Sequence, residues 1–188
     1  MPNAILPFWV ACLALAAGCG AAPKSATAPE PHAGVGADGG EGGPITVYVV
    51  RHAEKLVAAD APKDPPLSER GVRRAAALPT AVDAGALVAV YATPFARTRG
   101  TAAPCAEAAG LPITEYAPDD APGLAAKIRA LGGGGVLVVG HSNTVPEILT
   151  ALGVAEPVAL GDGDYGDLFV VTLAPSGAAA MERKRFGD

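Results

Sequence analysis

Four side chains that could bind and transfer phosphate each come shortly after a short apolar run. They are Arg51, His52, Arg97 and His141, and the runs are 45–50, 88–92 and 136–139. Guanidinium groups match phosphate oxygens in bidentate geometry, and a neutral imidazole nitrogen can attack phosphorus. These residue types therefore predict a site for a phosphate dianion, provided that the fold brings them together.

The apolar runs have the length and the β-branched composition of buried strands, and helical segments alternate with them. We expect a helix at 67–78, with Ser68 as N-cap and Pro79 closing it, and a helix at 95–109 that is disturbed or restarted near Pro104. Two more helices are expected, one at 122–131 and one from Thr144, which has capping-box spacing to Glu147. Further strands are expected at 113–116 and 168–173, and 178–186 is expected to pair back as an antiparallel edge.

This alternation predicts an α/β fold, a three-layer α/β/α sandwich with a mostly parallel central sheet. Because the carboxyl ends of parallel strands share one edge of a sheet, the two arginines and two histidines should converge on one cleft. Backbone N–H groups at the start of the helix near Thr144 would add to a site for an anion there.

Length and charge narrow the possible partners. The chain has 188 residues, which suggests one domain with extensions, and its formal net charge is −5. This charge gives no general attraction to nucleic acid or to an anionic membrane surface, so local arginines would have to bind any phosphate. Cys105 is the one cysteine in the body of the chain, so we expect no intrachain disulfide there and a small core residue instead.

The amino-terminal residues predict export. An apolar block at 4–19 is short for a membrane span and ends in small residues, which is typical of a signal peptide over 1–19. Residues 15–19 (Leu-Ala-Ala-Gly-Cys) resemble a bacterial lipoprotein processing site, which implies lipidation of Cys19. The expected location is the cell envelope, lipid-anchored and facing the periplasm or exterior. Ordinary secretion, if Cys19 is not lipidated, and an uncleaved anchor are the alternatives.

An Ala/Pro/Gly-rich composition follows at 20–43 and predicts a flexible linker, so the folded domain is expected at 44–188. Within that domain, five motifs resemble those of the histidine phosphatase superfamily, also called the phosphoglycerate mutase-like family. They lie at 51–55 (Arg-His-Ala-Glu-Lys), 67–71, 92–102, 139–144 and 165–169, and the resemblance covers 45–173. It implies a phosphoglycerate mutase-like fold.

The resemblance also implies roles for individual residues. His52 matches the nucleophile that becomes a phosphohistidine, Arg51 and Arg97 match the clamping arginines, and His141 matches the second histidine of the phosphate pocket. Ser142 and Asn143 could contribute further groups to phosphate. No cofactor and no metal is required by this chemistry.

The proton donor for the leaving group is left open by the sequence. The candidates are Asp119, Asp120, Glu115 and Glu107, with Asp119 the residue we select; Asp119 or Asp120 could equally be the N-cap of the helix at 122–131, and the site could lack a dedicated acid. Glu54 and Lys55 either touch substrate at the mouth of the cleft or are solvated loop charges. Arg99 is expected to face elsewhere.

The resulting hypothesis is a metal-independent phosphomonoester or phosphoramidate hydrolase that acts through a phosphohistidine on His52. The alternative is a non-catalytic envelope lipoprotein domain that binds a phosphorylated ligand or partner. Expected partners are a phosphorylated small molecule or phosphoprotein and, through the lipid anchor, a membrane, but no nucleic acid. A purely structural envelope protein would not explain the four pocket residues.

Overall fold

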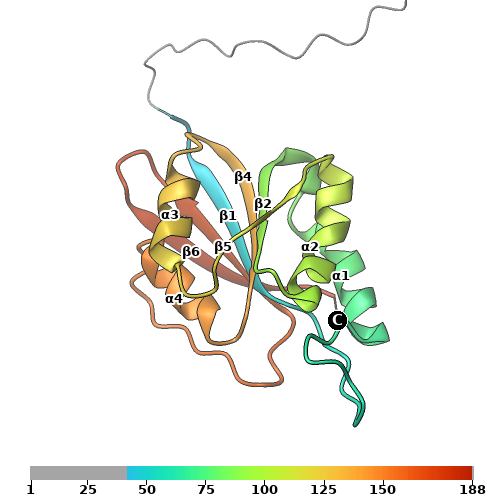
Figure 1. Ribbon diagram of the computed structural model, residues 1–188. Helices are drawn as coiled ribbons and strands as arrows, with labels where there is room; N and C mark the ends of the chain where they lie inside the picture. Colours follow the sequence, from blue (N-terminus) through green and yellow to red (C-terminus); the bar gives the residue numbers. More distant parts are fainter. Residues whose placement is uncertain (1–41, 188) are drawn as a thin grey trace, which may run out of the picture. The chain divides into compact units, whose positions relative to one another are not determined.

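A six-stranded sheet organises residues 42–187, the part of the chain that the computed structural model describes (Figure 1). The predicted signal peptide, Cys19 and nearly all of the predicted linker lie outside the described residues. The strands are β1 (Ile45–Arg51), β2 (Leu87–Ala92), β3 (Ile113–Glu115), β4 (Gly134–Gly140), β5 (Asp167–Leu173) and β6 (Ala179–Arg185), in the spatial order β3-β2-β4-β1-β5-β6. Among residues 42–187, no helix is both long enough and apolar enough to cross a bilayer.

The sheet is mostly parallel, as predicted. β1 pairs in parallel with β4, and β2 pairs in parallel with both β4 and β3. β5 runs antiparallel to β1, and β6 runs antiparallel to β5, which confirms the expected antiparallel edge. The amino end of β5 therefore lies at the same edge as the carboxyl ends of β1, β2 and β4.

Helices cover both faces of the sheet and complete the predicted three-layer sandwich. α3 (Ala121–Arg129) and α4 (Thr144–Ala151) pack on one face, while α1 (Glu69–Ala81) and α2 (Ala96–Ala109) pack on the other (Figure 1). Successive strand residues alternate between the two cores, as the pleat of a strand requires. Val47 and Val49 enter the core under α3 and α4, whereas Val50 enters the opposite one.

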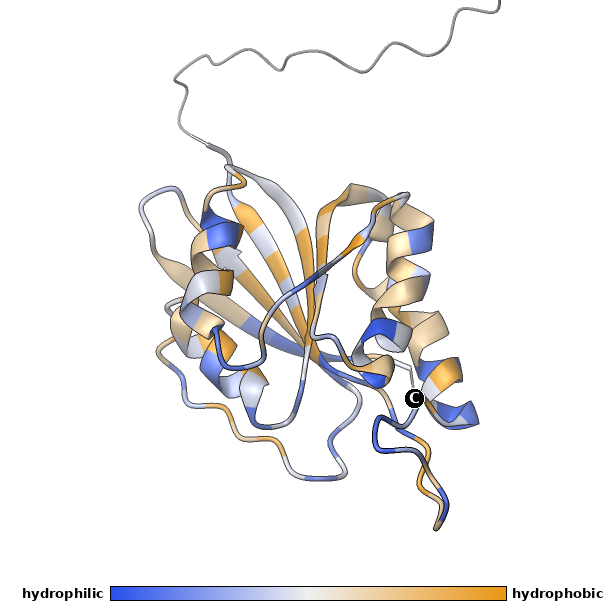
Figure 2. Cartoon of the chain, in the orientation of Figure 1, coloured by the Kyte–Doolittle hydropathy of each residue, from blue (hydrophilic) through white to orange (hydrophobic). Residues whose placement is uncertain are grey.

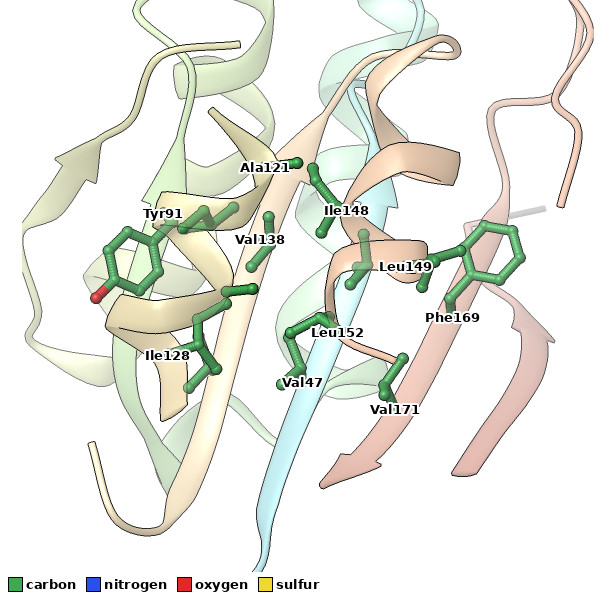
Figure 3. Close-up of a cluster of buried hydrophobic side chains, with 14 of the residues drawn as sticks. Val47, Tyr91, Ala121, Ile128, Val138, Ile148, Leu149, Leu152, Phe169 and Val171 are labelled. Carbon is green, nitrogen blue, oxygen red and sulfur yellow. The ribbon is translucent and has the colours of Figure 1, made fainter. Parts of the chain in front are cut away.

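Both cores are built from aliphatic residues. The apolar colours of Figure 2 concentrate on the central strands, which are covered by helices on both faces. Figure 3 shows the core beneath α3 and α4, where Val138 of β4, Phe169 of β5 and Ile148 of α4 belong to one cluster of buried side chains. Cys105 is completely buried in the other core, as expected, and burial raises the pKa of its thiol to about 12.

Three details of the helices differ from prediction or sharpen it. Pro79 and Pro104 lie inside α1 and α2, so neither proline ends or interrupts its helix. Each proline removes one backbone donor, but neighbouring side chains such as Leu78 and Cys105 are fully buried, and tertiary packing outweighs local propensity there. Ser68 is the N-cap of α1, as predicted, and accepts a hydrogen bond from the Gly71 N–H at 3.2 Å.

The predicted capping box at Thr144 is wrong. Asn143 occupies the N-cap position of α4 without a side-chain capping bond, and Thr144 lies inside the helix. The Thr144 hydroxyl instead accepts a hydrogen bond from the backbone N–H of His141 at 2.9 Å. The threonine therefore fixes the turn that carries His141 rather than capping the helix.

Candidate active site

A cavity of about 400 Å³ opens at the edge of the sheet where β1, β2 and β4 end. Its lining consists of Arg51, His52, Lys55, Phe95, Arg97, Pro118, His141, Ser142, Asn143, Thr144 and Asp162. The structure thus brings together six of the residues that the sequence singled out for phosphate, from Arg51 to Asn143. Asp119, the selected proton donor, is exposed and is not part of this lining, although its neighbour Pro118 is.

One ring nitrogen of His52 is hydrogen-bonded to the backbone, and the other remains free to react. Its Nδ1 lies 2.8 Å from the carbonyl oxygen of Ala53, which can only accept, so Nδ1 carries the proton and Nε2 carries the lone pair. The backbone N–H of His52 donates to Gly140 O at 2.9 Å, and that of Ala53 donates to the Thr101 hydroxyl at 2.9 Å. β4 and α2 therefore both fix the segment that carries the imidazole.

Burial keeps both histidines neutral. Burial lowers the pKa of His52 from 6.5 to about 4; the bond to Ala53 opposes this shift, and the charges of His141, Arg51 and Arg97 add to it. Burial also lowers the pKa of His141 to about 4, with Arg97 and Arg51 contributing. Near neutral pH each imidazole is uncharged, so His52 can act as a nucleophile.

His141 is oriented by a chain of hydroxyl groups beneath it. Its Nε2 lies 2.9 Å from the Thr93 hydroxyl, which lies 2.9 Å from the Thr98 hydroxyl. Its Nδ1 lies 3.4 Å from the guanidinium of Arg97, which can only donate, so Nδ1 is the acceptor and Nε2 the donor. The ring packs edge-on against Phe95, with the ring centroids 5.2 Å apart, and against His52, with the centroids 5.4 Å apart.

Arg51 is fixed by the loop that precedes β5. Its Nη1 donates to the carbonyl oxygens of Gly161 at 2.7 Å and Asp162 at 3.1 Å, and its guanidinium lies 4.2 Å from the centre of the Tyr165 ring. The Nε of Arg51 is buried and has no hydrogen-bond partner among the described residues. This donor is the kind that a bound oxyanion would satisfy, because buried polar groups rarely stay unpaired.

Arg97 projects from the first turn of α2. Its guanidinium lies 4.4 Å from the centre of the Phe95 ring, and Nη1 lies 3.4 Å from a carboxylate oxygen of Asp64. The carbonyl of Arg97 accepts a hydrogen bond from Thr101 at 2.7 Å, and Thr101 also binds the backbone beside His52. One threonine therefore links the second arginine to the nucleophile segment.

The other acidic candidates lie away from the cavity lining. Asp120 is the N-cap of α3 and accepts from the Gly123 N–H at 2.9 Å, while exposed Glu115 pairs with Arg99 at 3.0 Å. Glu107 is exposed on α2. Asp162 is the acidic residue that the described lining does contain, and it is exposed. None of these observations assigns a proton donor, and the role of Asp119 stays a prediction.

Glu54 and Lys55 separate in the structure. Lys55 lines the cavity, whereas the Glu54 carboxylate pairs with Arg74 and Arg70, each at 3.0 Å. Burial alone would raise the pKa of Glu54, but hydrogen bonds from Arg74 and the two arginine charges hold it below its usual value. Glu54 therefore anchors the nucleophile segment to α1 and does not face the cavity.

Several site residues have no clear signal in the sequence. Thr93, Thr98, Thr101, Asp64 and the loop at 161–165 all support the pocket, yet the sequence singled out none of them for that role. Thr101 could have been found, because it follows Arg97 by one helical turn. Asp64 and the loop reach the site through tertiary contacts, which no local pattern reports.

Comparison with known proteins agrees with this geometry. Residues 47–117 match the family described as the histidine phosphatase superfamily (branch 1). This part of the chain is therefore similar to the histidine phosphatase superfamily. The matched segment includes Arg51, His52 and Arg97, and His141 lies beyond it. A search of the curated proteins found no match to the sequence.

Solved structures share the fold of this domain. The protein histidine phosphatase SixA complexed with tungstate is 22% identical with a TM-score of 0.59, covering 74% of this chain and 96% of that one. Phosphoglycerate mutase from Bacillus anthracis is 20% identical with a TM-score of 0.55, covering 79% and 95%. Phosphoserine phosphatase from Entamoeba histolytica is 14% identical with a TM-score of 0.56, covering 77% and 97%. The domain thus has a phosphoglycerate mutase-like architecture.

Within residues 42–187, no group of three or more His, Cys, Asp or Glu side chains is arranged to hold a metal ion. The groups that line the cavity include two guanidiniums, two imidazoles, and the side chains at the start of α4. This set can bind an oxyanion, attack it with one imidazole, and balance the charge on its oxygens.

Proposed function

We propose that this chain is a phosphatase that transfers a phosphoryl group to Nε2 of His52 and then to water. The family match and the phosphatase neighbours support a phosphatase. The observation that carries the proposal is the state of His52: Nδ1 is committed to Ala53 O, the pKa is low, and Arg51 and Arg97 line the same cavity. Neutral imidazole, clamped phosphate and in-line attack together split one difficult hydrolysis into two displacements.

In the first displacement, the Nε2 lone pair forms a bond to phosphorus while the bond from phosphorus to the leaving group breaks. The leaving group keeps that electron pair and takes up a proton from solvent or from an acid of the site. In the second displacement, a water oxygen forms a bond to phosphorus and the water releases one proton to solvent, while the N–P bond breaks and its electron pair returns to Nε2. Arg51 and Arg97 stabilise the charge on the phosphoryl oxygens in both steps.

We infer that phosphoramidates, such as phosphohistidine, are better substrates than alkyl phosphates. The described lining holds one acidic residue, exposed Asp162, so leaving groups that need little help from an acid should react fastest. An imidazole leaves as a neutral molecule once its other nitrogen is protonated, whereas an alkoxide needs a proton in the transition state. SixA, which shares this fold, is named a protein histidine phosphatase, and that name supports the same inference.

The test uses the purified chain in EDTA with p-nitrophenyl phosphate and with a histidine-phosphorylated peptide. We expect turnover of both and an acid-labile, alkali-stable phosphoenzyme that His52→Ala abolishes. His32→Ala, a histidine outside the predicted domain, is the matched control. Unchanged activity in His52→Ala, or activity that chelator removes, would reject the proposal. Tight phosphate binding without turnover across a broad substrate panel would favour the binding-domain alternative.

We also propose that the chain is a lipoprotein of the cell envelope anchored through Cys19. The support is the sequence alone, namely the apolar block and the small residues before the cysteine. In cells fed labelled palmitate, we expect the full chain to carry label and the Cys19→Ser chain to carry none. Label that persists in Cys19→Ser would refute the anchor, and an unlabelled chain recovered from the medium would indicate ordinary secretion.

A further inference from the structure

The carboxylate of Asp64 connects the start of α2 to the guanidinium of Arg97. One oxygen, Oδ2, accepts the backbone N–H of Ala96 at 2.9 Å, and the other, Oδ1, lies 3.4 Å from Nη1 of Arg97. Asp64 lies in the loop at 55–67, more than thirty residues before α2, and it does not itself line the cavity. Asp64 therefore contacts Arg97 from outside the cavity.

α2 needs such a contact because its own N-cap supplies none. Phe95 occupies the N-cap position, and the cap has no side-chain hydrogen bond. The first N–H groups of a helix have no partner within it, and a carboxylate near them is favoured by both hydrogen bonding and the helix dipole. Asp64 thus replaces the missing cap, and the turn it holds is the turn that carries Arg97.

The loop around Asp64 is built to keep the carboxylate in place. Pro65 and Pro66 follow directly, and proline fixes its own backbone angle and restricts the residue before it. The loop is closed at its base by a bridge between Lys55 and Leu67 and by a hydrogen bond from Leu56 N to Pro66 O at 2.8 Å. Figure 1 shows this loop beyond the carboxyl ends of the strands, beside α1.

We propose that Asp64 is a positioning residue: it fixes the first turn of α2 and points the guanidinium of Arg97 at bound phosphate. This role for Asp64 rests on the proposed function in one respect only, namely that the cavity binds phosphate. A freed arginine would sample other rotamers, and phosphate would have to order it on binding. The carboxylate also repels phosphate, but its side chain is 42% exposed, so water screens that repulsion. The two effects predict opposite results when Asp64 is removed.

The experiment measures the affinity of the full chain for inorganic phosphate by calorimetry, which requires no turnover. Asp64→Asn keeps an oxygen for the Ala96 N–H and loses the charge beside Arg97, so we expect phosphate to bind about threefold more weakly. Asp64→Ala loses both contacts, and we expect a loss of about tenfold. In turnover assays, KM should rise while kcat falls less.

Asp120→Ala is the matched control. Asp120 caps α3 through the Gly123 N–H at 2.9 Å, the same distance as the Asp64 bond, and does not line the cavity. We expect Asp120→Ala and Asp64→Ala to lower the melting temperature alike, because each loses one cap. Only the Asp64 change should weaken phosphate binding, and a general loss of stability would weaken binding in both.

Each outcome bears on the proposal. Phosphate affinity that is unchanged or tighter in Asp64→Asn overturns it, and this variant decides the question even if Asp64→Ala does not fold. Asp64→Asn as weak as Asp64→Ala supports it and assigns the effect to the ion pair with Arg97. If the wild-type chain binds phosphate but hydrolyses nothing, the proposed function fails while Asp64 is still tested. If the wild-type chain does not bind phosphate, both fail.

Discussion

The two neutral histidines should make this protein unusually sensitive to mild acid. His52 is 5% exposed and His141 is 8% exposed, and both have a pKa of about 4 in the folded chain against 6.5 for the ordinary imidazole. The unfolded chain therefore binds protons at a pH where the folded chain does not. By linkage, stability is full above about pH 6.5 and falls as pH drops toward 4.

The size of the effect follows from those pKa values. For one histidine with folded and unfolded pKa values of about 4 and 6.5, linkage gives a loss of about 2 kcal/mol between pH 8 and pH 5. Two such groups give about 4 kcal/mol, which is a large part of the 5–15 kcal/mol that is typical of a folded domain. Carboxylates such as Glu54 also titrate in acid, so the histidine part has to be isolated by comparison with variants.

The assay is urea unfolding in phosphate-free buffer at about pH 8 and about pH 5 for the wild type, His52→Asn and His141→Gln. The asparagine amide can still donate to Ala53 O, and the glutamine amide can still donate to the Thr93 hydroxyl, so each variant keeps the bond and removes the titration. We expect the free energy of unfolding of each variant to fall by about 2 kcal/mol less than that of the wild type between the two pH values.

Equal losses in the wild type and in both variants would refute the reasoning, because they would show that neither imidazole titrates at a lowered pKa. A loss that is larger in the variants would contradict its sign. Added phosphate supplies a further check. Its negative charge favours the protonated imidazoles, so it should flatten the dependence of stability on pH in the wild type and much less in the variants.

Two further predictions concern the proton donor and the packing behind the nucleophile. Asp119→Asn should lower kcat for an alkyl phosphate by about 100-fold and leave p-nitrophenyl phosphate nearly unaffected, because Asp119 is the selected donor and only the poor leaving group needs an acid. Equal effects on both substrates would exclude Asp119 as the donor. Gly71→Ala should cost about 3 kcal/mol in urea unfolding, since a Cβ there would overlap the backbone carbonyl of Glu54. Gly85→Ala, where the added carbon meets only Asp83 Oδ1 at 3.9 Å, is the control, and equal stability of the two variants would contradict this account.

The sequence alone determined the sheet and four residues of the pocket. The apolar runs at 45–50 and 136–139 predict buried strands, since each is short, rich in β-branched residues and soon followed by polar groups. Parallel pairing of β1, β2 and β4 then forces Arg51, His52, Arg97 and His141 to one edge. That inference needed no side-chain detail, because strand direction fixes which ends meet.

The order of the elements could not show what holds those residues in place. β5 runs antiparallel to β1, so the loop at 161–165 returns to the site and supplies carbonyl acceptors for Arg51. Asp64 reaches α2 from a separate loop, and Glu54 turns away from the cavity to pair with Arg74. These are contacts between distant segments, and local residue patterns carry no information about them.

The protonation state of His52 likewise depends partly on the sequence and partly on the tertiary structure. The sequence indicated a nucleophilic histidine close to two arginines. In the structure, burial between the strand ends is the main cause of its low pKa, and one bond to Ala53 decides which nitrogen is free. Residue type and spacing determined that an imidazole would be near two guanidiniums, whereas its neutrality and its reactive atom were decided by the tertiary structure, because desolvation and hydrogen-bond direction exist only once the chain has folded.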